Sequence, residues 1–270
     1  MNILEKIIAH KRTEVAERQS LYPAKLLERS IFFETPTVSL TKYLRRPDRH
    51  GIIAEFKRRS PSKGVLNAYA KVEQTTIGYM QAGASALSIL TDEHFFGGKN
   101  EDLTTARKFN FCPILRKDFT ISEYQIIEAR SIGADAILLI AAVLTPQEVR
   151  QLGAFARSLG LEVLLEIYDG SELGHLCDTV DAVGVNNRNL ADFSVDVRRS
   201  FELGAMIPND FVKISESGLN DPATVVALRA AGFQGFLIGE NFMKHSRPEE
   251  ASKEFIATLA TLERQRTPAI

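Results

Sequence analysis

The chain has few cysteines, little net charge and no long apolar run, and each absence excludes a class of protein. With only Cys112 and Cys177 among 270 residues, it has neither a disulfide framework nor a paired metal-binding spacing. The formal net charge of -1 gives no overall attraction to nucleic acid or to a membrane surface, so an anionic ligand needs a local positive site. The longest apolar run, residues 136–144, is too short to span a bilayer.

Two further absences bear on cofactors and location. The five histidines show no ligand spacing, and neither a Walker A nor a Rossmann motif occurs, so we expect no metal and no cofactor. Charged residues interrupt the N-terminal segment, which therefore does not have the pattern of a signal peptide. We expect a cytoplasmic protein with a small-molecule ligand, no nucleic acid and no membrane.

Short apolar segments recur from residue 52 onward, separated by helix-like segments, and this rhythm is typical of βαβ units. They predict strands near residues 52–57, 85–91, 112–117, 135–140, 161–166, 181–186, 211–216 and 235–239. Gly83, Gly133, Gly160 and Gly232 stand where the preceding helices should end in a left-handed residue. A doubly wound sheet would favour a glycine-rich first loop, whereas residues 57–64 are basic, so we predict an α/β fold of the (β/α)8 TIM-barrel type.

The N-terminal segment, residues 1–50, is predicted to be a helical extension of this barrel. Residues 2–19 read as an amphipathic helix with apolar residues at helical spacing and charges on the other face, and shorter helices are expected near 23–29 and 39–45. No convincing linker interrupts the chain, so we expect residues 1–270 to form one barrel domain.

Ionisable residues stand at the ends of four predicted strands: Lys57, Lys117, Glu166 and Glu216. The carboxyl ends of barrel strands converge on one pocket, so these four distant positions should meet there. Glu55 and Lys57 are two residues apart and share a strand face, either as a structural ion pair or as part of a site.

Several chemical readings of these residues stay open from spacing alone. Lys117 fits a general acid, a Schiff-base nucleophile or an anion anchor, and equally a lysine that reaches solvent. Glu166 follows an apolar strand, and such a setting would raise the pKa of its carboxyl group toward the range of a general base. The alternative is an exposed neighbour of a helix N-cap.

The loops after the last three strands suggest ligand contacts. Asn186 can donate and accept hydrogen bonds and Arg188 can grip a carboxylate, although their composition alone favours a turn. Ser217, Gly218 and Gly239 follow the seventh and eighth strands, where barrels often cradle a phosphate with backbone N–H groups. An aromatic pair, residues 95–96, could form the wall of an aromatic substrate site or simply cover the core.

Taken in order, these segments resemble the indole-3-glycerol-phosphate synthase family over nearly the whole chain. The matching motifs are Glu55-Phe56-Lys57-Arg58-Arg59-Ser60-Pro61-Ser62-Lys63-Gly64, Leu90-Thr91-Asp92 with Phe95-Phe96-Gly97-Gly98, Leu115-Arg116-Lys117-Asp118-Phe119, Asn186-Asn187-Arg188-Asn189-Leu190, Ser215-Glu216-Ser217-Gly218 and Ile238-Gly239-Glu240. The resemblance implies a cofactor-free enzyme of tryptophan biosynthesis. Its substrate would be 1-(2-carboxyphenylamino)-1-deoxyribulose 5-phosphate, and ring closure with decarboxylation and dehydration would give indole-3-glycerol phosphate.

The resemblance also implies a role for each matching residue. Lys117 would be the general acid, Glu166 the general base and Lys57 a second catalytic lysine. The supporting polar residues would be Glu55, Asn186, Glu216 and Ser217; the phosphate contacts Ser60, Gly218, Gly239 and the backbone N–H of Glu240; the carboxylate contact Arg188; and the wall around the aromatic ring Pro61, Phe96, Phe119 and Leu190. We expect a monomer, with association with other tryptophan-pathway enzymes left open.

Three other functions compete with this prediction. A sugar-phosphate isomerase on the same barrel usually needs a carboxylate and a thiol, but Cys112 and Cys177 do not stand at strand ends. A Schiff-base aldolase would use Lys117 or Lys57 as its nucleophile. A non-catalytic phosphate-binding barrel is the third, and the full set of ionisable strand-end residues argues against it.

Overall fold

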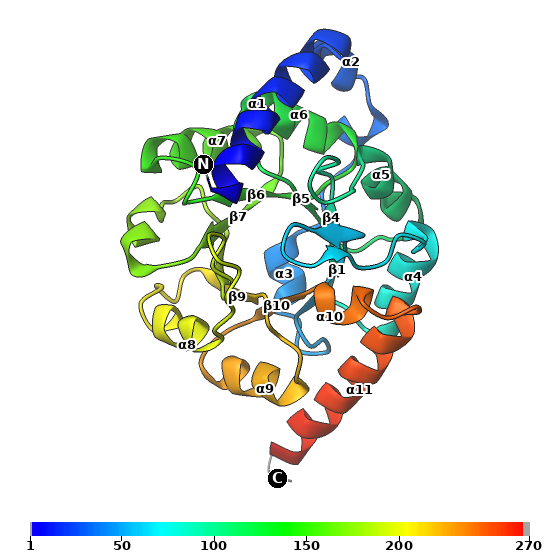
Figure 1. Ribbon diagram of the computed structural model, residues 1–270, viewed down its shortest axis with the longest axis vertical. Coiled ribbons are helices and arrows are strands. Elements are labelled where there is room, and N and C mark those ends of the chain that lie inside the picture. Colours follow the sequence, from blue (N-terminus) through cyan, green and yellow to red (C-terminus); the bar gives the residue numbers. More distant parts are fainter. Residues whose placement is uncertain (1, 267–270) are drawn as a thin grey trace.

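The computed structural model describes residues 2–266, and its central feature is a closed barrel of eight parallel strands (Figure 1). The strands are β1 (Ile52–Phe56), β4 (Ala86–Leu90), β5 (Ile114–Lys117), β6 (Ala136–Ile140), β7 (Glu162–Ile167), β8 (Ala182–Asn186), β9 (Val212–Glu216) and β10 (Gly235–Ile238). Barrel strands that follow one another in the chain pair with each other, and β10 closes the barrel by pairing with β1. The predicted (β/α)8 barrel and its eight strands are confirmed, with ends that differ by no more than two residues.

Helices surround the barrel, as the alternation in the sequence predicts (Figure 1). They are α4 (Val72–Ala82), α5 (Asn100–Phe109), α6 (Glu123–Ser131), α7 (Pro146–Ser158), α8 (Arg198–Gly204), α9 (Pro222–Ala230), α10 (Glu240–Met243) and α11 (Pro248–Arg266), with the 3-10 helix η2 (Gly170–His175) after β7. Gly83 ends α4 with a left-handed φ of 104°, and the glycines at 133, 160 and 232 also have positive φ, which confirms the predicted helix ends.

The inward faces of the strands divide the barrel interior into an apolar half and a charged half. Alternate side chains of a strand point to the same side. On β1, Ile53 belongs to the interior core and Glu55 follows two residues later; on β7, Leu164 and Glu166 repeat this order. The same change occurs on β5 and β9, so the ionisable side chains gather at the carboxyl ends of the strands.

The N-terminal segment forms α1 (Ile3–Leu21), α2 (Ala24–Leu27), the 3-10 helix η1 (Ile31–Phe33) and α3 (Leu40–Leu44), which confirms the predicted helices. Leu40 and Leu44 of α3 enter the interior core and close the N-terminal end of the barrel. The carboxylate of Glu162, at the start of β7, accepts a hydrogen bond of 2.8 Å from the backbone N–H of Thr41 and so fixes α3 in place.

Two features differ from the predictions. The basic segment after β1 forms a short hairpin of β2 (Arg59–Ser60) and β3 (Gly64–Val65), because antiparallel pairing satisfies backbone groups that an open loop would leave to water. Lys11 of α1 lies on the buried face of its helix between Ile7 and Val15, not on the charged face, because carboxylates of the barrel surround its ammonium group. Among residues 2–266, no helix has the length and apolar character needed to cross a membrane.

The position of α3 predicts the effect of Leu40→Ala. Truncating this fully buried side chain removes apolar contacts at the closed end of the barrel and leaves a cavity. We expect the free energy of unfolding, measured by urea denaturation, to fall by about 2–5 kcal/mol. The control Leu26→Ala, at a position that is 51% exposed, should change it by less than about 0.5 kcal/mol. Equal losses in the two variants would contradict the role of α3 as part of the core.

Candidate active site

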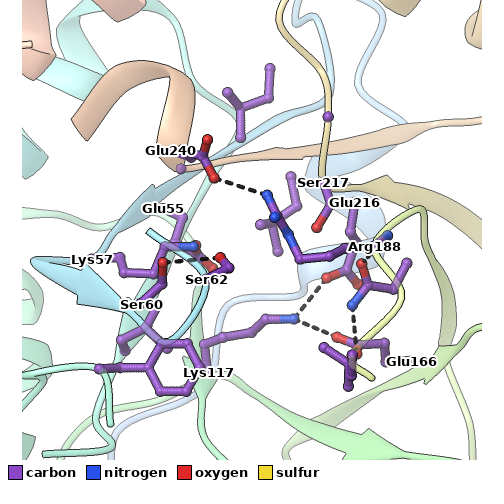
Figure 2. A pocket seen from close by; sticks show the side chains of 18 of the residues that line it. Glu55, Lys57, Ser60, Ser62, Lys117, Glu166, Arg188, Glu216, Ser217 and Glu240 are labelled. Atoms are coloured by element: carbon purple, nitrogen blue, oxygen red, sulfur yellow. Dashed lines mark hydrogen bonds and ion pairs between the residues drawn. The ribbon is translucent and has the colours of Figure 1, made fainter. Parts of the chain in front are cut away.

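The carboxyl ends of the strands enclose a cavity of about 330 Å³ (Figure 2). All sixteen residues predicted for the site line this cavity: Glu55, Lys57, Ser60, Pro61, Phe96, Lys117, Phe119, Glu166, Asn186, Arg188, Leu190, Glu216, Ser217, Gly218, Gly239 and Glu240. The fold therefore brings together side chains from segments up to 185 residues apart in the sequence, from Glu55 to Glu240. Their individual chemical roles stay predictions.

Lys117 lies between two carboxylates at the centre of the site, as Figure 2 shows. Its Nζ donates to Glu166 Oε2 at 2.8 Å and to Glu216 Oε2 at 2.7 Å. Asn186 donates from Nδ2 to the other Glu166 oxygen at 3.0 Å, whereas Glu216 Oε1 is buried and has no hydrogen-bond partner among the described residues. The strands β5, β7, β8 and β9 thus position an ammonium group and two carboxylates that differ in their hydrogen bonds.

These contacts set the charges of the three groups. Burial opposes the charge of Lys117, but the two facing carboxylates outweigh it and raise its pKa, so the amine stays protonated. Burial likewise opposes ionisation of Glu166, yet Lys117 and Asn186 lower the pKa of this carboxyl group. Burial raises the pKa of Glu216 to about 7, and the negative charges of Glu166 and Glu55 add to the shift, which Lys117 only partly opposes.

The expectation of a raised pKa for Glu166 was therefore wrong. The apolar strand before Glu166 does bury it, but tertiary contacts with Lys117 and Asn186 reverse the effect. The raised pKa belongs to Glu216 instead. The two carboxylates share one lysine, so they titrate as a pair in which one member is ionised and the other changes charge near neutral pH.

Glu55 and Lys57 form a second ion pair, on the β1 side of the cavity. Lys57 Nζ donates to Glu55 Oε1 at 2.6 Å, and Ser88 donates to Glu55 Oε2 at 3.3 Å. Gly239 makes room for this pair, because a Cβ atom there would lie 2.5 Å from Glu55 Oε1. The side chain of Lys57 is 17% exposed and so remains accessible to a ligand from the cavity.

The predicted anion cradle consists of backbone and hydroxyl groups after β9 and β10 and on the hairpin, and these residues line the cavity. Ser217 and Gly218 are successive residues with left-handed φ of 69° and 76°, a conformation that a serine adopts only where its surroundings hold it. Ser60, on β2, directs its hydroxyl to that of Ser62 at 3.3 Å (Figure 2). Small side chains here let a ligand approach the main chain closely.

Arg188 and Glu240 form an ion pair that sequence patterns did not reveal. Arg188 Nη2 donates to Glu240 Oε2 at 2.9 Å, and Lys63 Nζ lies 3.9 Å from the other oxygen of this carboxylate. Only the backbone N–H of Glu240 was predicted to face the phosphate; its side chain takes part in this ion pair with Arg188. Arg188 lies in a turn, closed by its bridge to Val195, and still reaches the cavity.

Aromatic and aliphatic side chains form the remaining wall. The ring centroids of Phe96 and Phe119 are 5.9 Å apart, a distance typical of aromatic pairs. Pro61 and Leu190 line the same cavity, and Leu138 contributes from β6. The cavity therefore combines a flat apolar wall, cations and an anion cradle, which together suit a ligand with an aromatic ring and two acidic groups.

Other sequence features lie away from the cavity. Cys112 is buried just before β5 and Cys177 lies between η2 and β8, and neither lines the site. Within residues 2–266, no three His, Cys, Asp or Glu side chains are grouped to hold a metal ion. Asp92 and Asp118, which follow β4 and β5, were not predicted as functional, although their places at strand ends gave a signal for them.

A (β/α)8 barrel with buried ionisable groups gathered at the carboxyl ends of its strands has the architecture of a barrel enzyme. Residues 4–255 match the family described as Indole-3-glycerol phosphate synthase. The chain belongs to this family, whose members are carboxy-lyases of tryptophan biosynthesis.

The similarity to known proteins covers almost the full length of both this chain and its relatives. An indole-3-glycerol phosphate synthase from Bacteroides thetaiotaomicron is 48% identical over 258 residues, which are 96% of this chain and 99% of the relative. One from Magnetococcus marinus is 41% identical over 95% of this chain and 98% of its own length. A chain of a solved structure described as "Structural basis of mutual activation of the tryptophan synthase a2b2 complex from a hyperthermophile, Pyrococcus furiosus" has a TM-score of 0.58 at 16% identity, covering 79% of this chain and 99% of its own, which shows a shared fold.

The raised pKa of Glu216 predicts how stability depends on pH. Between about pH 4.5, where an unfolded glutamate titrates, and about pH 7, the folded chain holds a proton that the unfolded chain releases. The stability from this group is therefore complete below pH 4.5 and is lost as the pH rises to about 7. Relative to Glu216→Gln, the free energy of unfolding of the wild type should fall by up to about 3 kcal/mol over this range.

Urea denaturation of both proteins at a series of pH values measures this difference. Glu17→Gln, at an exposed position of α1 away from this pair, is the matched control and should keep the pH dependence of the wild type. A wild-type stability that runs parallel to that of Glu216→Gln from pH 4.5 to pH 7.5 would contradict the raised pKa.

Proposed function

We propose that the chain converts 1-(2-carboxyphenylamino)-1-deoxyribulose 5-phosphate to indole-3-glycerol phosphate, with release of CO2 and water. The observation that carries this proposal is the ammonium group of Lys117, held between Glu166 and Glu216 beside an aromatic wall. Membership of the indole-3-glycerol phosphate synthase family supports the same substrate. The substrate has one ring, one carboxylate and one phosphate, and the cavity has a complementary group for each.

The parts of the substrate are assigned to parts of the cavity by their chemistry. The phosphate is placed at Ser60, Gly218, Gly239 and the backbone of Glu240, where hydroxyl and main-chain groups are accessible. The ring packs between the apolar side chains that include Phe96 and Phe119. Its carboxylate faces the cations Lys57 and Arg188. In this orientation the keto oxygen of the sugar faces the ammonium group of Lys117.

The proposed reaction begins with carbon–carbon bond formation. The ring carbon that carries the carboxylate attacks the keto carbon, and the keto oxygen takes a proton from Lys117. The ring then regains its aromatic electrons as the bond to the carboxylate breaks and CO2 leaves. Holding the ring carbon against the keto carbon supplies much of the acceleration, because the attack becomes intramolecular in a fixed geometry.

Dehydration completes the indole ring. The hydroxyl group formed in the first step takes a second proton from the recharged Lys117 and leaves as water. Glu166 accepts the proton that is lost as the new ring double bond forms and returns it to Lys117, its neighbour at 2.8 Å. The sum consumes one proton from solvent, which restores the charge of Lys117. The lowered pKa of Glu166 keeps this base ionised, and Glu216, which titrates near neutral pH, helps to keep Lys117 charged and oriented.

The competing functions account less well for the site. A Schiff-base aldolase needs a neutral amine, but the two carboxylates raise the pKa of Lys117 and keep it protonated. An isomerase with a thiol acid is disfavoured because Cys112 and Cys177 lie outside the cavity.

The raised pKa of Lys117 also has a consequence for the proposed reaction. The bound substrate must draw the ammonium group away from at least one carboxylate before Lys117 gives up its proton.

Turnover of the substrate by purified chain, without added metal or cofactor and followed by indole fluorescence, tests the proposal. Lys117→Ala and Glu166→Gln should each lower kcat by about 10²–10⁴, the usual contribution of a positioned acid or base, with little change in KM. Lys108→Ala, on the exposed end of α5, is the charge-matched control and should retain full activity. Near-normal turnover in Lys117→Ala would remove this residue from the acid role.

The ion pair between Arg188 and Glu240 predicts an unusual result for Glu240→Gln. The substitution removes a negative charge beside the anion cradle and frees Arg188 from its partner. A partly exposed pair contributes up to about 1 kcal/mol, so KM should fall by about two- to fivefold while kcat changes little. Steady-state kinetics at low ionic strength measures this change. An increase in KM would show instead that Glu240 positions Arg188 for binding.

A further inference from the structure

Lys11 is the most deeply buried cation of the N-terminal helix. Its residue exposure is 0%, and it lies on the face of α1 that packs against the barrel, one turn from Ile7 and one from Val15. A buried ammonium group is costly unless carboxylates compensate its charge. The contacts of this one side chain therefore show what α1 does at the carboxyl end of the barrel.

Three carboxylates surround the Lys11 ammonium group. Its Nζ lies 2.9 Å from Asp92 Oδ2 and 2.9 Å from Asp118 Oδ1, and it donates to Glu14 of the same helix at 3.0 and 3.1 Å. Asp92 follows β4 and Asp118 follows β5, and both are at most 3% exposed. One cation thus joins α1 to two neighbouring loops at the mouth of the barrel.

Each of the two aspartates also holds the main chain of an aromatic residue. Asp92 Oδ1 accepts hydrogen bonds from the backbone N–H groups of Phe95, at 2.8 Å, and Phe96, at 3.2 Å. Asp118 Oδ1 accepts one from the backbone N–H of Phe119 at 2.8 Å. Phe96 and Phe119 are the ring pair that lines the cavity. The distance between these two rings therefore depends on two carboxylates that a single ammonium group holds together.

Lys11 itself does not line the cavity, so it acts on a ligand only through these loops. Asp118 also directly follows Lys117 in the chain, which places the same anchor one residue from the proposed general acid. The pKa of Lys11 is raised because Asp118 and Asp92 outweigh the effect of burial, so the bridge is ionic throughout the neutral range.

We propose that Lys11 is a positioning residue whose ammonium group, through Asp92 and Asp118, sets the spacing of Phe96 and Phe119 for the aromatic ring of the substrate. This inference rests on the proposed function for the identity of that ring. It assigns to α1 a part in binding the ring end of the ligand and none in binding the phosphate end, whose contacts lie on other loops.

Other contacts fix α1 to the barrel and separate this role from simple docking of the helix. Arg18 Nε donates to Glu128 of α6 at 2.6 Å, and the hydroxyl of Tyr124 donates to the carbonyl of Tyr22 at 3.0 Å. Thr91 donates a hydrogen bond of 2.6 Å to Asp118 Oδ2, the carboxylate oxygen that Lys11 does not contact. Removing the Lys11 charge should therefore leave α1 in place while it releases the two loops from each other.

The test compares Lys11→Met with Lys6→Met, an exposed lysine of the same helix. Two probes are titrated against each protein: anthranilate, which carries the ring and the carboxylate, and inorganic phosphate. In Lys11→Met we expect anthranilate affinity and kcat/KM to fall about 10- to 100-fold, as for other small misplacements at a site, with phosphate affinity within twofold of wild type. Lys6→Met should match wild type for both probes.

A second variant guards against loss of folding. Lys11→Met combined with Asp92→Asn removes one charge of each sign, so it should restore much of any fall in melting temperature while ring affinity stays weak. Equal weakening of anthranilate and phosphate would indicate a general charge effect, and unchanged anthranilate affinity would indicate a purely structural lysine; either result would overturn the proposal, as would a wild-type chain that does not bind anthranilate.

Failure of the proposed function gives a different result. A wild-type chain that binds both probes but forms no indole product would contradict the proposed reaction. The ratio of anthranilate to phosphate affinity in the variants would still decide the role of Lys11, because that readout needs no turnover.

Discussion

The site depends on one interaction, the sharing of the Lys117 ammonium group by the carboxylates of Glu166 and Glu216. The three groups come from three strands, β5, β7 and β9. Burying any one of these groups as a charge is costly, and each offsets part of the desolvation of its partners. Because β5, β7 and β9 must hold their registers for the three groups to meet, barrel closure and chemistry depend on the same strand pairing. A fold with the same strands in another order would bury three unpaired charges.

The apolar core that stabilises the barrel and the buried charges of the site lie in different halves of its interior. The interior half near α3 is apolar, with Leu40, Leu44 and the inward residues of the strands packed together. The other half contains buried charges, which weaken a core unless every partner is present. Glu216 Oε1, which has no hydrogen-bond partner within residues 2–266, shows that this half is not arranged for stability alone. The apolar half offsets that cost and keeps the strands rigid beneath the site.

The sequence allowed prediction of the strands and of which side chains would meet, but not of how they would share charge. Period-two spacing puts Glu55 two residues after Ile53 and Glu166 two after Leu164, so convergence on one cavity follows from the strand pattern and barrel geometry. The opposite pKa shifts of Glu166 and Glu216 could not be predicted, because they depend on burial and on how the two carboxylates divide their contacts with Lys117, Asn186 and each other. The partners of Lys11 lie about 80 and 107 residues away, beyond any local pattern.

The closed end formed by α3 has a consequence for the traffic of molecules through the barrel. With Leu40 and Leu44 sealing the far end, a ligand enters and its products leave by the same opening. If the chain acts as proposed, CO2, water and indole-3-glycerol phosphate must therefore all leave through this one opening. The phosphate ester, as the largest product and the one with the most contacts, would then leave last, and the hairpin that carries Ser60 would form part of the wall around it.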